Sequence, residues 1–139
     1  MSVVTKKIKL SSKGETDIID ITDKVSNCVG DSRVKDGIVT IFVSGSTGGL
    51  TTVEYESGLI KDVKQAFEVI APRDGEYRHN LRWHDGNGFS HVRATILGPS
   101  LTVPFANKRL QLGTWQQIVF IDFDNRPRSR EIVVQIIGE

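Results

Sequence analysis

Residues 114–137 have the sequence TWQQIVFIDFDNRPRSREIVVQII, and they give the clearest indication of the architecture. Residues 114–124 and 130–137 are rich in β-branched and aromatic side chains, which favour strands. Between them, Asp124-Asn125-Arg126-Pro127 is typical of a turn. This stretch therefore predicts two long strands that pair as a β-hairpin.

Further strands are predicted on the N-terminal side of this stretch. Residues 91–97 and 100–105 have strand-like patterns, and Gly98-Pro99 separates them with a turn. Residues 3–10 predict a first strand, and residues 38–43 predict a strand that is buried on both faces or nearly so.

Two helices complete the prediction. The clearer one lies between Ser57, which can cap it, and Pro72, which ends it. Its apolar residues recur at helical spacing: Leu59, Ile60, Val63, Ala66, Phe67 and Ile70. A shorter helix follows the capping oxygens of residues 20–23. We therefore expect a single domain, residues 1–139, of the α+β class, with a mostly antiparallel β-sheet or sandwich and two helices.

Composition excludes several classes of protein. The 139 residues include 18 Lys and Arg against 17 Asp and Glu, so the net charge of +1 argues against a nucleic-acid partner. No apolar run is long enough to span a membrane, and the first residues lack the apolar segment of a signal peptide. Cys28 is the single cysteine and cannot form an internal disulfide. We expect a cytoplasmic protein with no membrane partner.

All three histidines lie in residues 79–91, within a segment that also holds Asp85 and Asn87. On the predicted strand, alternation places His91 and Arg93 on the same face. A histidine and an arginine there would bind an anion, or hold a metal beside an anion. The alternative is that these side chains only solvate a surface.

A second candidate segment, residues 44–56, follows the predicted strand 38–43. Its small residues leave backbone N–H groups free to surround an anion, and Ser46 and Thr47 add hydroxyl donors. Glu54 can act as an acid or base, or as a solvated charge. The alternative for the whole segment is a flexible hairpin, since it matches neither a Walker loop nor a dinucleotide fingerprint.

Two groups of residues in the C-terminal part of the chain also allow two interpretations each. Trp115 and Gln116 form either a pocket wall or part of a network between strands. Three arginines at positions 126, 128 and 130 either grip a phosphate or pair with Asp122, Asp124 and Glu139, and we favour the structural role.

Several motifs occur in the order seen in the YjbQ family, which the chain resembles over essentially its whole length. The motifs are Tyr77-x-His79-Asn80, Asp85-x-Asn87-x-x-x-His91-Val92-Arg93-Ala94, residues 97–104, Leu110-x-Leu112-Gly113-Thr114-Trp115-Gln116-Gln117-Ile118 and residues 130–139. The family is also described as secondary thiamine-phosphate synthase. The resemblance implies a homotrimer that condenses a pyrimidine pyrophosphate with a thiazole phosphate and releases pyrophosphate.

The resemblance also implies roles for individual residues. His79, His91 and Glu54 would be catalytic, and His79 and His91 would hold a divalent ion such as Zn or Mg with an unknown third ligand. The expected substrate-binding residues are Ser46, Thr47, Asn87, Arg93, Trp115 and Gln116. The chain departs from the family at Gly45, where the family usually has histidine. The alternative function is therefore a non-catalytic trimer that binds a metal or a phosphorylated metabolite.

Overall fold

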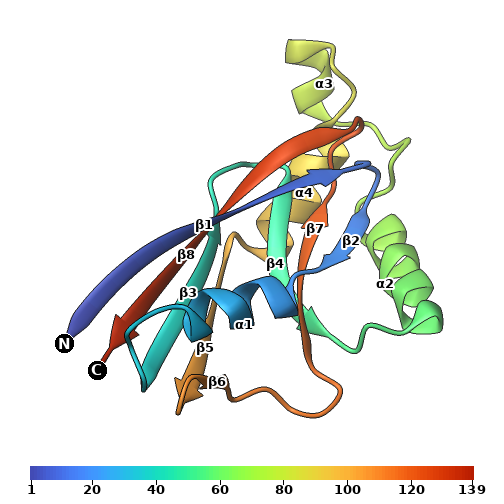
Figure 1. Ribbon diagram of the computed structural model, residues 1–139. Helices are drawn as coiled ribbons and strands as arrows, with labels where there is room; N and C mark the ends of the chain where they lie inside the picture. Colours follow the sequence, from blue (N-terminus) through green and yellow to red (C-terminus); the bar gives the residue numbers. More distant parts are fainter.

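A computed structural model describes all 139 residues, and its eight strands form two antiparallel sheets (Figure 1). The larger sheet has the order β1-β8-β3-β5-β6, and the smaller has the order β2-β7-β4. The strands are β1 Ser2–Ser12, β2 Asp17–Asp20, β3 Gly37–Val43, β4 Gly48–Val53, β5 Ser100–Ala106, β6 Arg109–Leu110, β7 Gln117–Asp122 and β8 Arg128–Gly138. The helices are α1 Thr22–Gly30, α2 Ser57–Ile70, α3 Arg78–Trp83 and α4 Gly88–Leu97. The predicted α+β class with antiparallel sheets is confirmed, with four helices in place of two.

The smaller sheet is the middle layer of the molecule. One side of β7, with Ile118 and Phe120, packs with the larger sheet and α1 in a cluster of 16 buried residues. Its other side, with Val119 and Ile121, packs in a second cluster with residues of α2 and α4. Strand β7 is therefore buried on both faces, which explains its continuous apolar sequence.

The predicted C-terminal hairpin is wrong. Strand β7 pairs with β2 and β4, whereas β8 pairs with β1 and β3. Residues 123–127 therefore carry the chain from one sheet to the other. The strand composition was recognisable, but the pairing depends on which apolar faces meet across the core.

Two other local predictions are corrected. Residues 91–97 belong to helix α4, and its buried residues Phe89, Ser90, Arg93 and Ala94 follow helical spacing. Strand β3 is buried on one face only, since Ile38 and Phe42 are 43% and 40% exposed. The cap of α2 is Glu56 in place of Ser57, because the Glu56 carboxylate accepts hydrogen bonds from the N–H groups of Gly58 and Leu59.

None of the helices is both long enough and apolar enough to cross a membrane.

Candidate functional site

A short loop, residues 44–47, connects β3 in the larger sheet with β4 in the smaller one. None of its four backbone N–H groups donates a hydrogen bond within the chain. Its side chains are small, and only Thr47 is buried. The loop therefore presents a row of unpaired donors, as the sequence predicted for an anion-binding segment.

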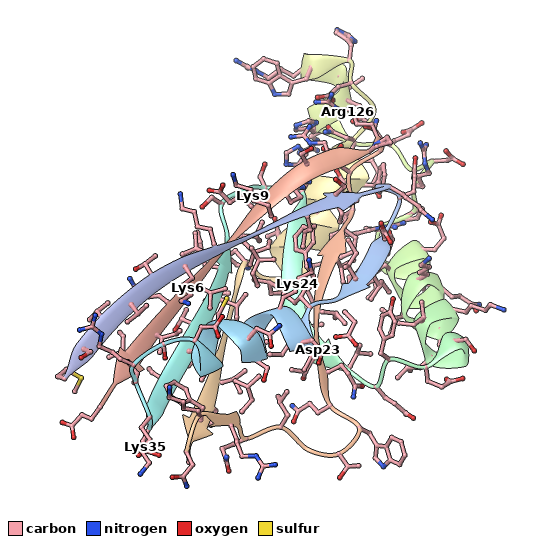
Figure 2. The ribbon with its side chains drawn as sticks, viewed as in Figure 1. Lys6, Lys9, Asp23, Lys24, Lys35 and Arg126 are labelled. Carbon is pink, nitrogen blue, oxygen red and sulfur yellow. The ribbon has the colours of Figure 1, made fainter.

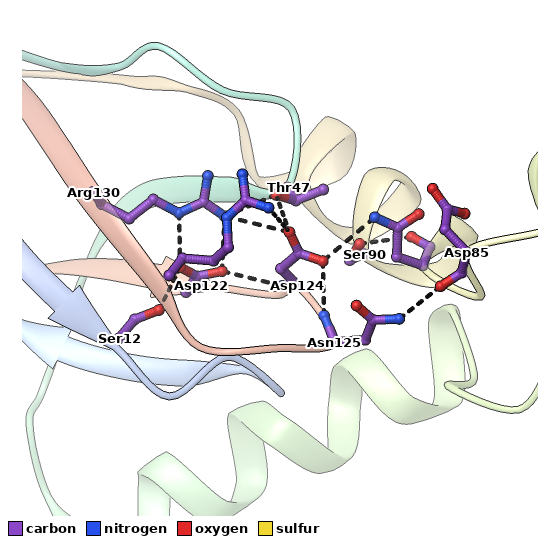
Figure 3. Close-up of polar contacts among 10 residues, drawn as sticks. Ser12, Thr47, Asp85, Ser90, Asp122, Asp124, Asn125 and Arg130 are labelled. Atoms are coloured by element: carbon purple, nitrogen blue, oxygen red, sulfur yellow. Dashed lines mark hydrogen bonds and ion pairs between the residues drawn. The ribbon is translucent and has the colours of Figure 1, made fainter. Parts of the chain in front are cut away.

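A buried ion-pair network lies beneath this loop (Figure 3). Arg130 of β8 donates from Nε to Oδ2 of Asp122 at 2.8 Å and from Nη2 to Oδ1 at 2.9 Å. Ser12 donates to the same carboxylate at 2.5 Å. Burial by itself raises the pKa of Asp122, but the hydrogen bonds from Arg130 and Ser12 hold the pKa below its ordinary value. Asp122 therefore stays ionised, and the pair joins the last residue of β7 to β8.

Asp124 links this network to the loop and to α4. Its Oδ2 accepts a hydrogen bond from Thr47 Oγ1 at 3.3 Å and lies 3.3 Å from Nη1 of Arg128. Thr47 Oγ1 in turn accepts from Nη2 of Arg130 at 2.8 Å. The Asn87 amide lies between two carboxylates: Nδ2 is 3.3 Å from Oδ1 of Asp124, and with the amide turned over it donates to Oδ1 and Oδ2 of Asp85 at 3.0 and 3.2 Å. The Thr47 hydroxyl and two of the three arginines are thus engaged in protein contacts, in agreement with the structural role favoured for the arginines.

Helices α3 and α4 bring two of the histidines together. The rings of His79 and His91 lie 4.4 Å apart between centroids, with 38° between their planes. A close contact at Gly88 permits this approach, because a Cβ at that position would lie 2.6 Å from Cβ of Tyr77. The third histidine, His84, ends α3 in a left-handed conformation with φ of 58° and is exposed.

The two stacked histidines have different electrostatic surroundings. Burial, followed by the repulsion from His79, lowers the pKa of His91, and Asp124, Asp85 and the Ser46 backbone oppose this only in part. His91 is therefore neutral near pH 7. His79 Nδ1 is buried and has no hydrogen-bond partner, although Oδ1 of Asp85 lies 3.5 Å away.

The residues present do not fit a metal ion held by His79 and His91. No group of three His, Cys, Asp or Glu side chains converges closely enough to bind one. A protein site for zinc needs at least three such ligands. Gly45 supplies no side chain that could act as a third ligand.

Arg93 is not available as a ligand contact. Its side chain is 5% exposed, and its donors bind Ala71 O at 2.9 Å, Thr16 Oγ1 at 2.8 Å and Glu68 Oε2 at 2.7 Å. The predicted substrate-binding role of Arg93 is therefore wrong. The strand prediction placed Arg93 beside His91, whereas on helix α4 it points to α2 and the loop before β2.

Glu54, Trp115 and Gln116 form a separate group. They lie beyond the C-terminal end of β4, whereas the loop of residues 44–47 precedes its N-terminal end. Glu54 and Trp115 line a shallow surface hollow, and Trp115 is 72% exposed. Gln116 donates from Nε2 to Thr52 Oγ1 at 3.1 Å. Within one chain these three residues do not join the histidine pair.

The structure thus assembles His79, His91, Ser46, Thr47 and Asn87 from the predicted set. It adds Asp122, Asp124 and Arg130, for which the sequence favoured ion pairs at a hairpin over a grip on phosphate. The available signal was Asp122, directly after the four apolar residues 118–121, followed by Asp124, because a carboxylate at the end of a buried strand needs a buried partner.

The fold and site define a class of protein: a two-sheet α+β domain with a stacked histidine pair beside a buried Arg–Asp network. The family described as UPF0047 protein YjbQ-like matches residues 6–139. The chain therefore belongs to the YjbQ-like UPF0047 family.

Individual relatives agree with this assignment. A UPF0047 protein of Methanothermobacter thermautotrophicus is 39% identical over 100% of this chain and 95% of its own. A solved structure of a YbjQ-like protein of unknown function from Sulfolobus solfataricus P2 has a TM-score of 0.94, with 34% identity and 99% of each chain covered. A hypothetical protein from Aeropyrum pernix K1 has a TM-score of 0.90, with 28% identity over 98% of this chain and 99% of its own.

Proposed function

We propose that this protein is an enzyme of the thiamine-phosphate synthase type that joins a pyrimidine pyrophosphate to a thiazole phosphate. In this reaction the lone pair of the thiazole nitrogen forms a C–N bond to the methylene carbon of the pyrimidine, while the C–O bond from that carbon to pyrophosphate breaks and its bonding electrons leave with pyrophosphate. The observation that carries the proposal is the stacked His79–His91 pair next to a loop, residues 44–47, whose N–H groups have no acceptor.

Each part of the site has a role in this reaction. The free N–H groups of residues 44–47 and the Ser46 hydroxyl bind phosphate oxygens and stabilise the charge that develops on the leaving pyrophosphate. His91 is kept neutral by its lowered pKa, so it takes up a proton from the substrates as pyrophosphate leaves and returns that proton once the C–N bond has formed, while His79 packs against it. Asn87 and Thr47 position these groups through Asp124.

The test is formation of thiamine phosphate by the purified protein, detected by mass spectrometry. His91→Ala is expected to lower turnover at least about a hundredfold, the usual size of a general acid–base contribution. His79→Ala is expected to lower it as well. His84→Asn is the matched control, because His84 lies outside the stacked pair and Asn tolerates its left-handed backbone. Wild-type turnover in His91→Ala contradicts the mechanism.

A non-catalytic protein that binds a phosphorylated metabolite is the second candidate. It is favoured by Gly45, because the chain has no side chain where the family usually has a histidine, and by the lack of three converging metal ligands. Thermal shifts measured with phosphorylated metabolites separate the candidates. A large stabilisation without any thiamine phosphate formed supports the binding protein and contradicts the enzyme.

We also propose that the chain assembles as a homotrimer. Helix α3 stands clear of the rest of the molecule at the end away from β6 (Figure 1). Its side chains Leu81 and Trp83 are 77% and 62% exposed. Apolar side chains of this size on a projecting helix support an interface between copies.

A further inference from the structure

We propose that Gly45 opens a subsite for a second anionic phosphoryl group, which the Arg130 guanidinium binds from below the loop of residues 44–47. The ligand class is a diphosphate, with inorganic pyrophosphate as the simplest member. The choice of a diphosphate over a monophosphate rests on the proposed function. Binding of the anion itself does not depend on turnover.

One nitrogen of the Arg130 guanidinium makes no hydrogen bond to the protein. The Arg130 side chain is 8% exposed, and its Nε and Nη2 are occupied by Asp122 and Thr47. Its Nη1 has no hydrogen bond within the chain, unlike the other two nitrogens. A guanidinium presents its donors in a planar fork, so the two bonds to Asp122 hold Nη1 in a fixed direction (Figure 3). The result is a preorganised donor without a protein acceptor.

Gly45, the residue beside this nitrogen, has no side chain. A Cβ on Gly45 would lie 3.2 Å from Nη1 of Arg130 and 4.0 Å from Cγ2 of Val43. The backbone at Gly45 is not in the left-handed region, so the local conformation does not require glycine. Glycine here leaves space that any other residue would partly fill, and the space lies beside the free donor.

The charges around the subsite also favour an anion. Asp122 and Asp124 balance Arg130 and Arg128, so the network by itself is near neutral. Lys9, exposed on β1, makes no ion pair, whereas the neighbouring Lys7 is 3.0 Å from Glu131 (Figure 2). The register pairs Leu10 with Arg130 and Lys9 with Glu131, so Lys9 lies on the opposite face of the sheet from the Arg130 guanidinium and is not part of the subsite. The positive character of the subsite comes from Nη1 of Arg130 and the free N–H groups of residues 44–47, which together favour a multiply charged anion.

The test uses Gly45→Asp, which places a carboxylate beside Arg130 Nη1 as an internal competitor. Pyrophosphate binding is measured by isothermal titration calorimetry at low salt, with inorganic phosphate as the comparison probe. We expect wild type to bind pyrophosphate more tightly than phosphate, and Gly45→Asp to weaken pyrophosphate binding at least tenfold. The new ion pair is also expected to raise Tm. Gly113→Asp is the matched control, because it makes the same charge change in an exposed loop, where a Cβ would meet only Gln116, at 3.7 Å.

Gly45→Ala is the second variant, because its small methyl group preserves folding while crowding Nη1. It is expected to weaken pyrophosphate binding by a smaller factor than Gly45→Asp. The proposal is overturned if wild type does not bind millimolar pyrophosphate, or if both Gly45 variants bind it as wild type does. If wild type binds pyrophosphate, Gly45→Asp does not, and wild type forms no thiamine phosphate, the result supports the subsite and contradicts the proposed enzyme activity. If wild type forms thiamine phosphate and both Gly45 variants bind pyrophosphate as wild type does, the result supports the enzyme activity and contradicts the subsite.

Discussion

Asp122 is the charged residue on which the candidate site most depends, because it is fully buried and satisfies two donors of Arg130. A buried ion pair contributes little net stability compared with apolar residues of the same shape, but removing one partner leaves an uncompensated charge. The pair therefore acts mainly to position Arg130 beneath the loop of residues 44–47. This is a positioning role, since Asp122 has no exposed atom for a ligand.

Asp122→Asn is expected to lower the free energy of unfolding by about 3 kcal/mol, the lower end of the usual range for a broken buried pair. The lower end applies because Asp124 lies 4.0 Å from Arg130 Nη2 and compensates part of the charge. Urea denaturation measures the change. Asp74→Asn, with a side chain 96% exposed, is the control and is expected to change stability by less than about 0.5 kcal/mol.

The same substitution has a pH signature with a defined sign. Hydrogen bonding to Arg130 and Ser12 holds the folded-state pKa of Asp122 below its ordinary value of 3.8, although burial opposes this. As pH falls, the unfolded chain therefore binds a proton at Asp122 before the folded protein does. The contribution of Asp122 to stability is fully present above the ordinary pKa of the carboxyl group. It is lost as the pH falls through the lower pKa of the folded state. Wild type is expected to lose more stability than Asp122→Asn in this acid range. Equal acid sensitivity in the two proteins contradicts the assignment.

Element by element, the sequence predicted long amphipathic or strongly β-branched segments better than short ones. Helix α2 was predictable because its apolar residues recur at helical spacing over 14 residues. Residues 91–97 were not, because Val92, Ala94 and Ile96 alternate as in a strand. The helix forms because Phe89, Arg93 and Ala94 are buried on the side that faces the smaller sheet and α2, a tertiary requirement that alternation does not reveal.

The start of β4 illustrates how one contact determines a residue type. A Cβ on Gly48 would lie 2.7 Å from two carbons of the Phe120 ring in β7. Gly48→Ala is therefore expected to lower the free energy of unfolding by about 1–3 kcal/mol through overpacking. Thermal or urea denaturation measures it.

Gly30→Ala is the opposite case and serves as the control. Gly30 is the last residue of α1, and a Cβ there meets nothing within 4 Å. The substitution is expected to stabilise the protein by about 0.4–1 kcal/mol, because alanine loses less backbone entropy on folding. If both alanine variants change stability in the same direction, the packing explanation for Gly48 is incorrect.

At the scale of the whole molecule, the two-sheet topology explains why the candidate site could be predicted only in part from the sequence. Arg130 and Asp122 are close in sequence but belong to different sheets, and the loop of residues 44–47 also crosses between sheets. Sequence patterns indicated the histidines and the small-residue loop, because their residue types are unusual. They could not place Glu54 and Trp115 at the opposite end of β4, since that depends on the direction in which the strand runs.

The proposed homotrimer is the prediction that belongs to the whole molecule. Light scattering coupled to size-exclusion chromatography is expected to give a mass of three 15.4 kDa chains. Trp83→Glu is expected to shift this toward the single chain, because a carboxylate placed in an apolar interface is costly to desolvate. Trp115→Glu is the matched substitution at an exposed tryptophan on another element. If Trp115→Glu dissociates the trimer and Trp83→Glu does not, the interface lies at the Glu54–Trp115 group and the assignment to α3 is wrong.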